Sequence, residues 1–431
     1  MSVETTTRSW GSRVGGAFKG ILIGILMIVV GCAVLFWNEG RTVKRAKALK
    51  EGASVVVDVD SATLDANNEG KLIHITGAAT AAEPLTDPFF GIRAEALKLE
   101  RKVEIYQWSE NVTTKTERGS RGSEIETTEY SYEKKWNEGL IDSSNFHDDG
   151  YDNPTTVPVE SESFTASLIK VGAYTLSDSL IAKISATNAF KPKHETSVKA
   201  ESVKGTNDVD ATDDDQENGE LVPSEISNEY GDEFTQVETE SLPSSVTTNT
   251  ENAKDFIPTE DGFYKGNPTS PQIGDIRVTY QYAPSPTTVS IVSEQSGESF
   301  VPYQAATDTV ELLTIGSVSS AEMFQGAQKA NKLAAWLLRA IGFILIFIGF
   351  KSVFAPLTVI ADIVPFAAKI VGAGTGFVAF SLSFCLSLAM IAIGWITYRP
   401  VVGITLLVIA VAVLILPLFR GKKSSTPNPG A

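Results

Sequence analysis

Long apolar runs near the two ends of the chain constrain its fold more than any other feature of the sequence. Residues 20–37, 371–397 and 401–419 contain no charged side chain, and residues 333–350 contain one, Arg339. A helix rises 1.5 Å per residue, so about 20 apolar residues cross the hydrocarbon core of a bilayer. We therefore predict a multi-pass α-helical membrane protein with four transmembrane spans.

The first apolar run is a retained anchor rather than a cleaved signal peptide. It is longer than the roughly 7–15 apolar residues of a signal sequence. It is followed by Trp37-Asn38-Glu39-Gly40-Arg41 rather than by small residues that suit cleavage. The last two runs are separated only by Tyr398-Arg399-Pro400, which predicts a tight turn between two helices, because Pro400 cannot continue a regular helix.

The distribution of basic residues predicts the orientation. The tail, residues 420–431, carries Arg420, Lys422 and Lys423 and no acidic residue, which is typical of a cytoplasmic segment. With four spans the N-terminal arm, residues 1–19, is then cytoplasmic as well. Residues 38–332 would be extracytoplasmic, in a periplasm or a lumen. The basic cluster after the first span favours the opposite orientation, but long domains translocate largely regardless of charge.

Three features near the later spans allow more than one interpretation. Residues 351–370 are apolar but flanked by lysines, which predicts an interfacial loop. Arg339 lies within a span, where a charge either serves a function or extends its side chain to the lipid headgroups. Gly372 and Gly376 are four residues apart, a spacing that permits close packing of helices but also occurs by chance.

The region between the first and second spans predicts a large, mainly β, α+β domain. Alternation of apolar and polar residues is clearest over 97–108, and a matching strand is expected over 126–136, joined to it by a long polar loop over 109–123. Helical spacing predicts helices over 176–186 and 320–332. Further strands are expected over the ranges 53–59, 71–77, 274–282, 289–291 and 310–315.

An acidic insert, residues 195–260, accounts for nearly all of the net charge. It contains 18 Asp and Glu against three Lys, which is −15 of the chain's total of −16. Its composition predicts disorder. Calcium binding is the alternative, but the run around Asp213-Asp214-Asp215 lacks the ligand spacing of a calcium loop. No basic stripe points to nucleic acid as a partner.

No constellation of residues predicts catalysis, a bound cofactor or a metal. The three histidines, His74, His147 and His194, are far apart, and none belongs to a known metal or nucleotide motif. His74 is expected on a polar strand face, and His147 in a polar loop. Both cysteines, Cys32 and Cys385, lie in apolar runs, where packing is their expected role.

Several segments resemble the transmembrane protein 43 family, also called LUMA. They run in the family's order and cover nearly the whole chain, apart from the acidic insert, which departs from the family pattern. They are Leu35 to Arg41, Asn68 to Gly77, Asp87-Pro88 through Glu104 to Trp108, Gly274 to Val278, and Gly394-Trp395 with Tyr398-Arg399-Pro400.

The resemblance implies one N-terminal span, a large extramembrane domain and three C-terminal spans. It also implies a scaffold that organises membrane proteins and associates with itself. The alternative function is a transporter or channel component, prompted by Arg339. The expected partners are the lipid bilayer, further copies of the chain and other membrane proteins. The expected location is a bacterial inner membrane with the domain in the periplasm, or else the endoplasmic reticulum and inner nuclear membrane with the domain in the lumen.

Overall fold

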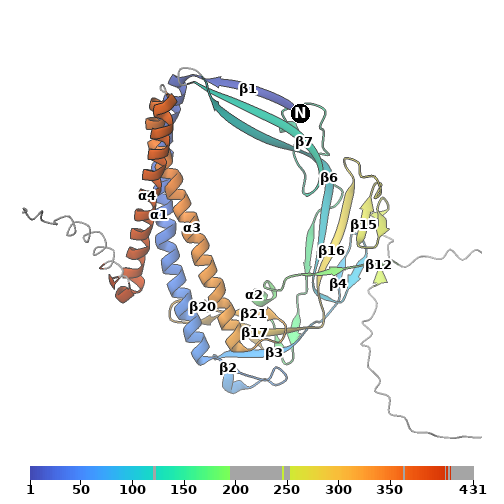
Figure 1. Ribbon diagram of the computed structural model, residues 1–431. Helices are drawn as coiled ribbons and strands as arrows, with labels where there is room; N and C mark the ends of the chain where they lie inside the picture. Colours follow the sequence, from blue (N-terminus) through green and yellow to red (C-terminus); the bar gives the residue numbers. More distant parts are fainter. Residues whose placement is uncertain are drawn as a thin grey trace, which may run out of the picture.

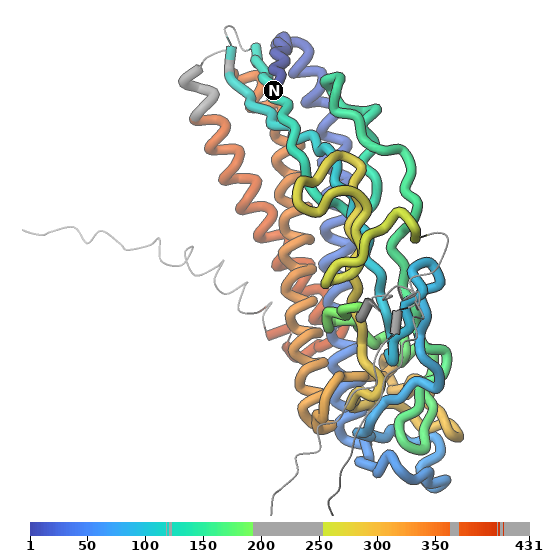
Figure 2. Tube along the Cα trace, turned by 90° about the vertical axis from the view of Figure 1, so that its right-hand side faces the viewer, coloured from blue at the N-terminus to red at the C-terminus, as the bar shows by residue number. Residues whose placement is uncertain are grey.

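The computed structural model describes residues 1–119, 123–194, 245–246, 253–362, 365–402, 404–405 and 408. It consists of a bundle of long helices and a curved β region beside it (Figure 1). The three long helices are α1 (Trp10–Val55), α3 (Ser320–Ala361) and α4 (Pro365–Tyr398), and they lie side by side in both views (Figure 2).

Three helices are long and apolar enough to cross a membrane. These spans fall within α1, α3 and α4, and the β region lies between the first and the second in sequence. The fourth predicted span, residues 401–419, lies almost entirely outside the described residues. The structure thus confirms a multi-pass membrane protein with a large β-rich region. The fourth span stays a prediction.

The helices are longer than their apolar runs, which corrects two predictions. α1 continues from the apolar run to Val55, so a strand over 53–59 was wrong except at β2 (Val57–Asp58). α3 continues through Pro356 to Ala361 and α4 begins at Pro365, so the predicted interfacial loop over 351–370 is mostly helical. A continuous helix satisfies its own backbone groups, which apolar surroundings require.

The strands form two large antiparallel-dominated sheets. The first has the order β1-β7-β6-β16-β15-β14, with β8 on β6 and β11 on β16. Its strands are β1 (Ser2–Arg8), β6 (Ala96–Arg118), β7 (Glu124–Glu138), β8 (Glu162–Thr165), β11 (Asn188–Phe190), β14 (Ile257–Thr259), β15 (Gly262–Lys265) and β16 (Ile276–Pro284).

The second sheet has the order β10-β9-β3-β17-β18, with β2 on β3 and β21 on β17. Its other strands are β3 (Leu72–Ala81), β9 (Ile169–Val171), β10 (Tyr174–Thr175), β17 (Thr287–Ser296), β18 (Ser299–Val301) and β21 (Leu312–Ile315). Two small sheets contain β4 (Leu85–Asp87), β5 (Ile92–Ala94), β12 (Lys193–His194) and β13 (Ser245–Val246), and β19 (Tyr303–Gln304) with β20 (Thr309–Val310). The helix predicted over 176–186 shortens to α2 (Asp178–Ile181).

A small apolar core joins the helices to the second sheet. Leu49 of α1 and Phe324 of α3 are buried together with Leu72 and Val292 of the sheet. A Cβ on Gly52 would lie 3.0 Å from the Phe324 ring, so α1 and α3 approach closely here. The ends of two membrane helices are therefore built into the β region rather than joined to it by flexible linkers.

Strands β6 and β7 form a long hairpin, here called the arm, that curves from the β region to the end of the helix bundle where α1 begins (Figure 1). They pair continuously from Glu104↔Glu138 to Arg118↔Glu124, so the polar loop predicted over 109–123 was wrong for most of its length. Polar cross-strand pairs such as Lys115 with Glu129 stabilise a two-stranded ribbon without apolar alternation. That pairing is what a search for apolar periodicity misses.

The tip of the arm is bound to the start of α1. β1 pairs with β7 in the antiparallel sense, from Ser2↔Tyr130 to Arg8↔Glu124. Arg13 in the first turns of α1 forms ion pairs with Glu124 (3.1 Å) and with Asp362 after α3 (2.6 Å). Residues 2–8 thus share a sheet with the arm, whereas the sequence prediction placed them on the opposite side of a bilayer. The side on which each part lies stays a prediction.

Most of the acidic insert, residues 195–244 and 247–252, lies outside the described residues. Its predicted end at 260 was placed too late. Phe256 is buried against Phe90, with ring centroids 5.1 Å apart, and β14 pairs with β15. Phe256 therefore belongs to the aromatic core of the first sheet and not to a disordered insert.

Candidate functional site: a polar junction of three helices

A buried carboxylate, that of Glu39 on α1, joins the three long helices. Only 1% of Glu39 is exposed. It accepts hydrogen bonds from Nε of Arg339 on α3 at 2.7 Å and from Nη2 of the same side chain at 2.9 Å. The indole N–H of Trp395 on α4 donates to the same carboxylate. Such a paired arrangement offsets the large cost of burying a charge.

Two glycines allow α4 to approach this carboxylate. A Cβ on Gly394 would lie 2.8 Å from Cβ of Glu39, and one on Gly40 would lie 2.7 Å from the Tyr398 ring. Both distances are shorter than real contacts, so larger residues would push α4 away from α1. The segments from Leu35 to Arg41 and from Gly394 to Pro400, which carried two parts of the family resemblance, thus meet in space.

Two asparagines add hydrogen bonds between α1 and α3 near the ion pair. Nδ2 of Asn38 donates to the Ala335 carbonyl, and Nδ2 of Asn331 donates to the Thr42 carbonyl, both at 3.0 Å. Oδ1 of Asn331 is buried and has no hydrogen-bond partner among the residues that the structure describes. One polar group at the junction is therefore left available to a donor from outside the chain.

Further from the junction, α1 and α3 cross at glycines spaced seven residues apart. A Cβ on Gly24 would lie 2.6 Å from the Gly349 carbonyl oxygen, and one on Gly31 would lie 2.9 Å from that of Gly342. The sequence suggested Gly372 and Gly376 as a packing face, but a Cβ on either would have no atom of the described chain within 4 Å. α1 and α3 therefore pack closely at glycines, but not at the two glycines that the sequence suggested.

The side chain of Arg339 is held between the helices by an ion pair, and whether it also reaches the level of the lipid headgroups stays a prediction. Its side chain is 16% exposed and bound to Glu39. Its guanidinium also lies over the rings of Trp336 and Trp395, at 5.0 and 5.9 Å from their centroids. In the sequence, Glu39 only follows the end of the first apolar run. An acidic residue next to an apolar run, with one arginine inside another run, was the signal for a pair between helices.

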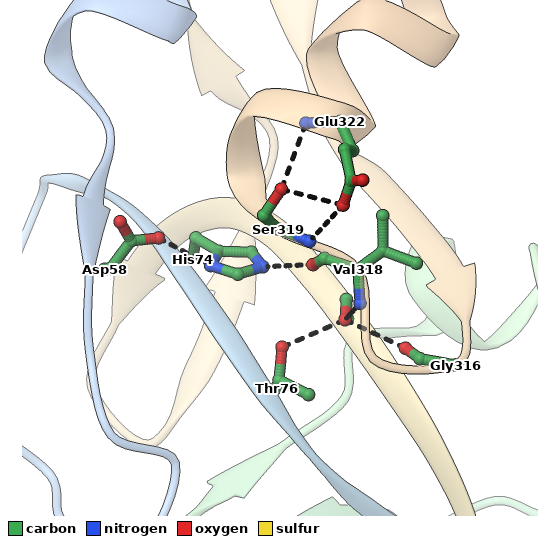
Figure 3. Close-up of polar contacts among 8 residues, drawn as sticks. Asp58, His74, Thr76, Gly316, Val318, Ser319 and Glu322 are labelled. Carbon is green, nitrogen blue, oxygen red and sulfur yellow. Dashed lines mark hydrogen bonds and ion pairs between the residues drawn. The ribbon is translucent and has the colours of Figure 1, made fainter.

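A second polar cluster surrounds His74, which is buried rather than on a polar surface as predicted (Figure 3). Nδ1 of His74 lies 2.7 Å from Asp58 and Nε2 lies 3.0 Å from the Val318 carbonyl oxygen. Only the protonated ring can donate to both oxygens, because the neutral ring has a single N–H. The Ser290 hydroxyl accepts from the backbone N–H of Val318. The sheet thereby fixes the segment that leads into α3.

The remaining histidines do not converge on a shared site. His147 stacks on Tyr130, with ring centroids 3.9 Å apart, and His194 falls in β12, where the structure does not describe side chains. Among the described residues, no three His, Cys, Asp or Glu side chains gather in a metal-binding arrangement. Cys32 and Cys385 are free thiols.

Comparison with known proteins identifies the family. The model of the transmembrane protein 43 family matches residues 105–400. Transmembrane protein 43 of Homo sapiens is 30% identical over 93% of this chain and 91% of its own length, and that of Rattus norvegicus is 30% identical over 90% and 86%. The homolog of Drosophila melanogaster is 27% identical over 90% of both chains. No solved structure matches. The chain belongs to the transmembrane protein 43 family.

Proposed function

We propose that the chain is a non-enzymatic membrane scaffold whose arm binds a second copy of the chain or another membrane protein. The observation that carries this proposal is an unpaired strand edge on β6. An exposed edge is a ready template for pairing with another strand. Family membership supports a membrane protein of this architecture, and the scaffolding role is our proposal.

The edge can be located from the hydrogen bonds of β6. Tyr106 and Trp108 direct their backbone N–H and C=O groups away from β7. The Tyr106 N–H donates to the Asp275 carbonyl, and its own carbonyl accepts from the Gly274 N–H. The Trp108 N–H and C=O both bond to the side-chain amide of Asn153. Because pairing with β7 continues without a bulge, every second residue beyond them faces the same way. Val112, Thr114 and Thr116 therefore direct backbone groups to an edge that no described strand covers.

The helix bundle would present this edge at a fixed place. The arm is joined to the sheet that contains β16 at one end and to α1 through β1 and Arg13 at the other. A rigid arm loses little conformational entropy when it pairs with a partner. We propose the membrane of residence as a bacterial inner membrane, with the domain in the periplasm. An endoplasmic reticulum or nuclear membrane is the alternative, with which the animal relatives are compatible.

The test is to block the edge without breaking the hairpin. Thr114→Pro removes an N–H that faces outward, whereas Thr114→Val keeps it and serves as the matched control. In native membranes, crosslinking followed by blue-native electrophoresis should show assemblies for the natural chain and for Thr114→Val, and fewer for Thr114→Pro. Equal assembly in all three, with unchanged protease resistance, would exclude this edge. A monomer in every case would exclude the scaffold.

A transporter or channel component is the second candidate, and the buried Glu39–Arg339 pair is what favours it. Charged residues inside membrane bundles often mark ion pathways. The pair is closed in by Gly394, Tyr398 and Trp395, which favours a structural role. Flux through liposomes that contain the natural protein, abolished by Arg339→Leu in a folded variant, would support the transporter. No flux above empty liposomes would remove it.

A further inference from the structure

Beside the polar junction lies an open cavity of about 380 Å³ whose charged lining residues are all basic. It is bounded by α1, α3 and the end of α4. Five cationic side chains line it and no carboxylate does; they are Lys47, Lys50, Lys332, Arg339 and Arg399. An anion is therefore the ligand that the charge of this cavity favours.

Four of these five cations are not neutralised by the protein. Arg339 is paired with Glu39. Lys47, Lys50, Lys332 and Arg399 form no ion pair or side-chain hydrogen bond with any residue in the described part of the chain. By contrast, Arg45 on the same helix is 3.8 Å from Asp308, and Lys183 is paired with Glu311. The cavity thus holds a local excess of four positive charges.

The cavity lies where a membrane changes from hydrocarbon to headgroups. The apolar run of α3 begins at Leu333, directly after Lys332, and that of α1 ends at Trp37, ten residues and about 15 Å before Lys47. Arg399 follows the last residue of α4, Tyr398. Basic pockets between helices at this level suit lipid headgroups that carry phosphate.

A second open cavity, also of about 380 Å³ and lined almost wholly by apolar groups, lies next to the first between α3 and α4. Trp336 and Arg339 line both cavities. Phe343 of α3 and Phe380 of α4 form its floor, with ring centroids 5.6 Å apart, and Phe384 stacks beside Phe380 at 6.3 Å. Phe380 and Phe384 are each about half exposed, at 49% and 50%.

Together the two cavities match a molecule with an anionic head and an apolar tail. We propose that the chain binds one anionic phospholipid here. Its phosphate lies among Lys47, Lys332 and Arg399, and an acyl chain lies over Phe343, Phe380 and Phe384. The basic and the apolar cavity share Trp336 and Arg339 as lining residues. A lipid could occupy both cavities at once, whereas a soluble phosphate would occupy only the basic one.

Two buried polar atoms without partners refine the ligand. Oδ1 of Asn331, in the basic cavity, is an acceptor and would be satisfied by a hydroxyl of the headgroup. The hydroxyl of Ser387, in the apolar cavity, is a donor and would be satisfied by an ester carbonyl. Both residues are more than nine-tenths buried, at 7% and 6% exposed. A hydroxylated headgroup such as glycerol therefore suits the site better than choline.

The experiment measures lipid retention by native mass spectrometry of the full-length protein in detergent, with phosphatidylglycerol and phosphatidylcholine added in equal amounts. The natural chain should retain one phosphatidylglycerol in preference. The variant Lys47→Gln/Lys332→Gln/Arg399→Gln should lower that retention by roughly 100-fold, since each cation near an anionic lipid contributes about fivefold. The control Lys19→Gln/Lys44→Gln/Lys329→Gln removes three cations from the same helices outside the cavity and should retain the lipid.

Two further arms separate a lipid from other anions. Ala340→Trp fills the apolar cavity and should reduce retention, whereas Ala373→Trp, at an exposed position of α4 outside it, should not. Glycerol phosphate without acyl chains should fail to displace the lipid. Equal retention of both lipids, equal loss in the control triple variant, no effect of Ala340→Trp, or displacement by glycerol phosphate would each overturn the proposal. Thermal unfolding in phosphatidylcholine alone reports whether each variant folds.

Discussion

The carboxylate of Glu39 is held by the guanidinium of Arg339 through two hydrogen bonds, although 300 positions of sequence separate the two residues. The pair connects the first membrane helix to the second, and Trp395 adds the third. Neither charge can be removed alone without leaving its partner buried.

This relationship predicts a strongly non-additive pair of substitutions. Glu39→Gln or Arg339→Met alone should lower the free energy of unfolding by about 3–5 kcal/mol, because a buried charge is left without its partner. The double variant should recover a large part of that loss. Chemical denaturation in detergent micelles, followed by tryptophan fluorescence, measures all three. Lys329→Met, at an exposed position of α3, is the control and should be near neutral. Additive losses in the double variant would show that the two side chains act independently.

The glycines at the crossing of α1 and α3 should tolerate no side chain. Gly24→Ala or Gly349→Ala places a methyl group against backbone 2.6 or 2.7 Å away and should cost about 1–3 kcal/mol of stability. Gly20→Ala and Gly372→Ala, which meet nothing within 4 Å, should be neutral or slightly stabilising, since alanine favours helix. Thermal unfolding in detergent compares the four. A similar loss at Gly372 would mean that this face also packs against protein.

The first turn of α3 should respond to acid. Hydrogen bonds from the Ser319 hydroxyl and from its backbone N–H hold the pKa of Glu322 below its usual value. A lowered pKa in the folded state stabilises the protein above the usual pKa of about 4.3, and this contribution is lost as the pH falls through the lowered value. Glu322→Gln keeps the cap but removes the titration.

The measurement is the difference in unfolding temperature between the natural chain and Glu322→Gln from about pH 6 to pH 3, where the carboxylate titrates. The advantage of the natural residue should shrink as the pH falls. A constant difference for Glu322→Gln would indicate that the carboxylate charge does not stabilise the cap.

Residues 198–240 of the acidic insert should be dispensable for folding, whereas Phe256, which follows the insert, should not. Replacing residues 198–240 with a short Gly-Ser linker should leave unfolding of the β domain unchanged, because a longer surface loop adds little closure entropy. Phe256→Ala should cost about 3–5 kcal/mol, since its ring is buried against Phe90 and Phe89. Ile257→Ala, at a side chain that is 49% exposed, is the matched control. Loss of folding on deletion would show that the insert belongs to the core.

The sequence predicted those parts of the fold that depend on local pattern. Alternation over 97–108 and 274–282 located β6 and β16, and apolar length located the helices of three spans. It could not locate the end of α1, because Ala46 to Ala53 favour helix whereas Val55 to Val57 favour strand, and only packing of Leu49 against the sheet decides between them. Long-range pairing likewise decides the length of the arm.

The junction of helices was predicted only in pieces. Arg339 drew attention because a charge inside an apolar run is costly. Its partner could not be inferred, because the register between α1 and α3 depends on where Gly24, Gly31, Gly342 and Gly349 let the backbones touch. His74 was misplaced for a related reason: its burial comes from the loop before α3, which is remote in sequence.

The pairing of β1 with β7 also has a consequence for the order in which the protein is made. Residues 2–8 are synthesised before the strand that they join, residues 124–138, which follows more than a hundred residues later. Between the two, α1 must already have been delivered to its membrane. The pairing of β1 with β7 can therefore form only after residues 124–138 have been made.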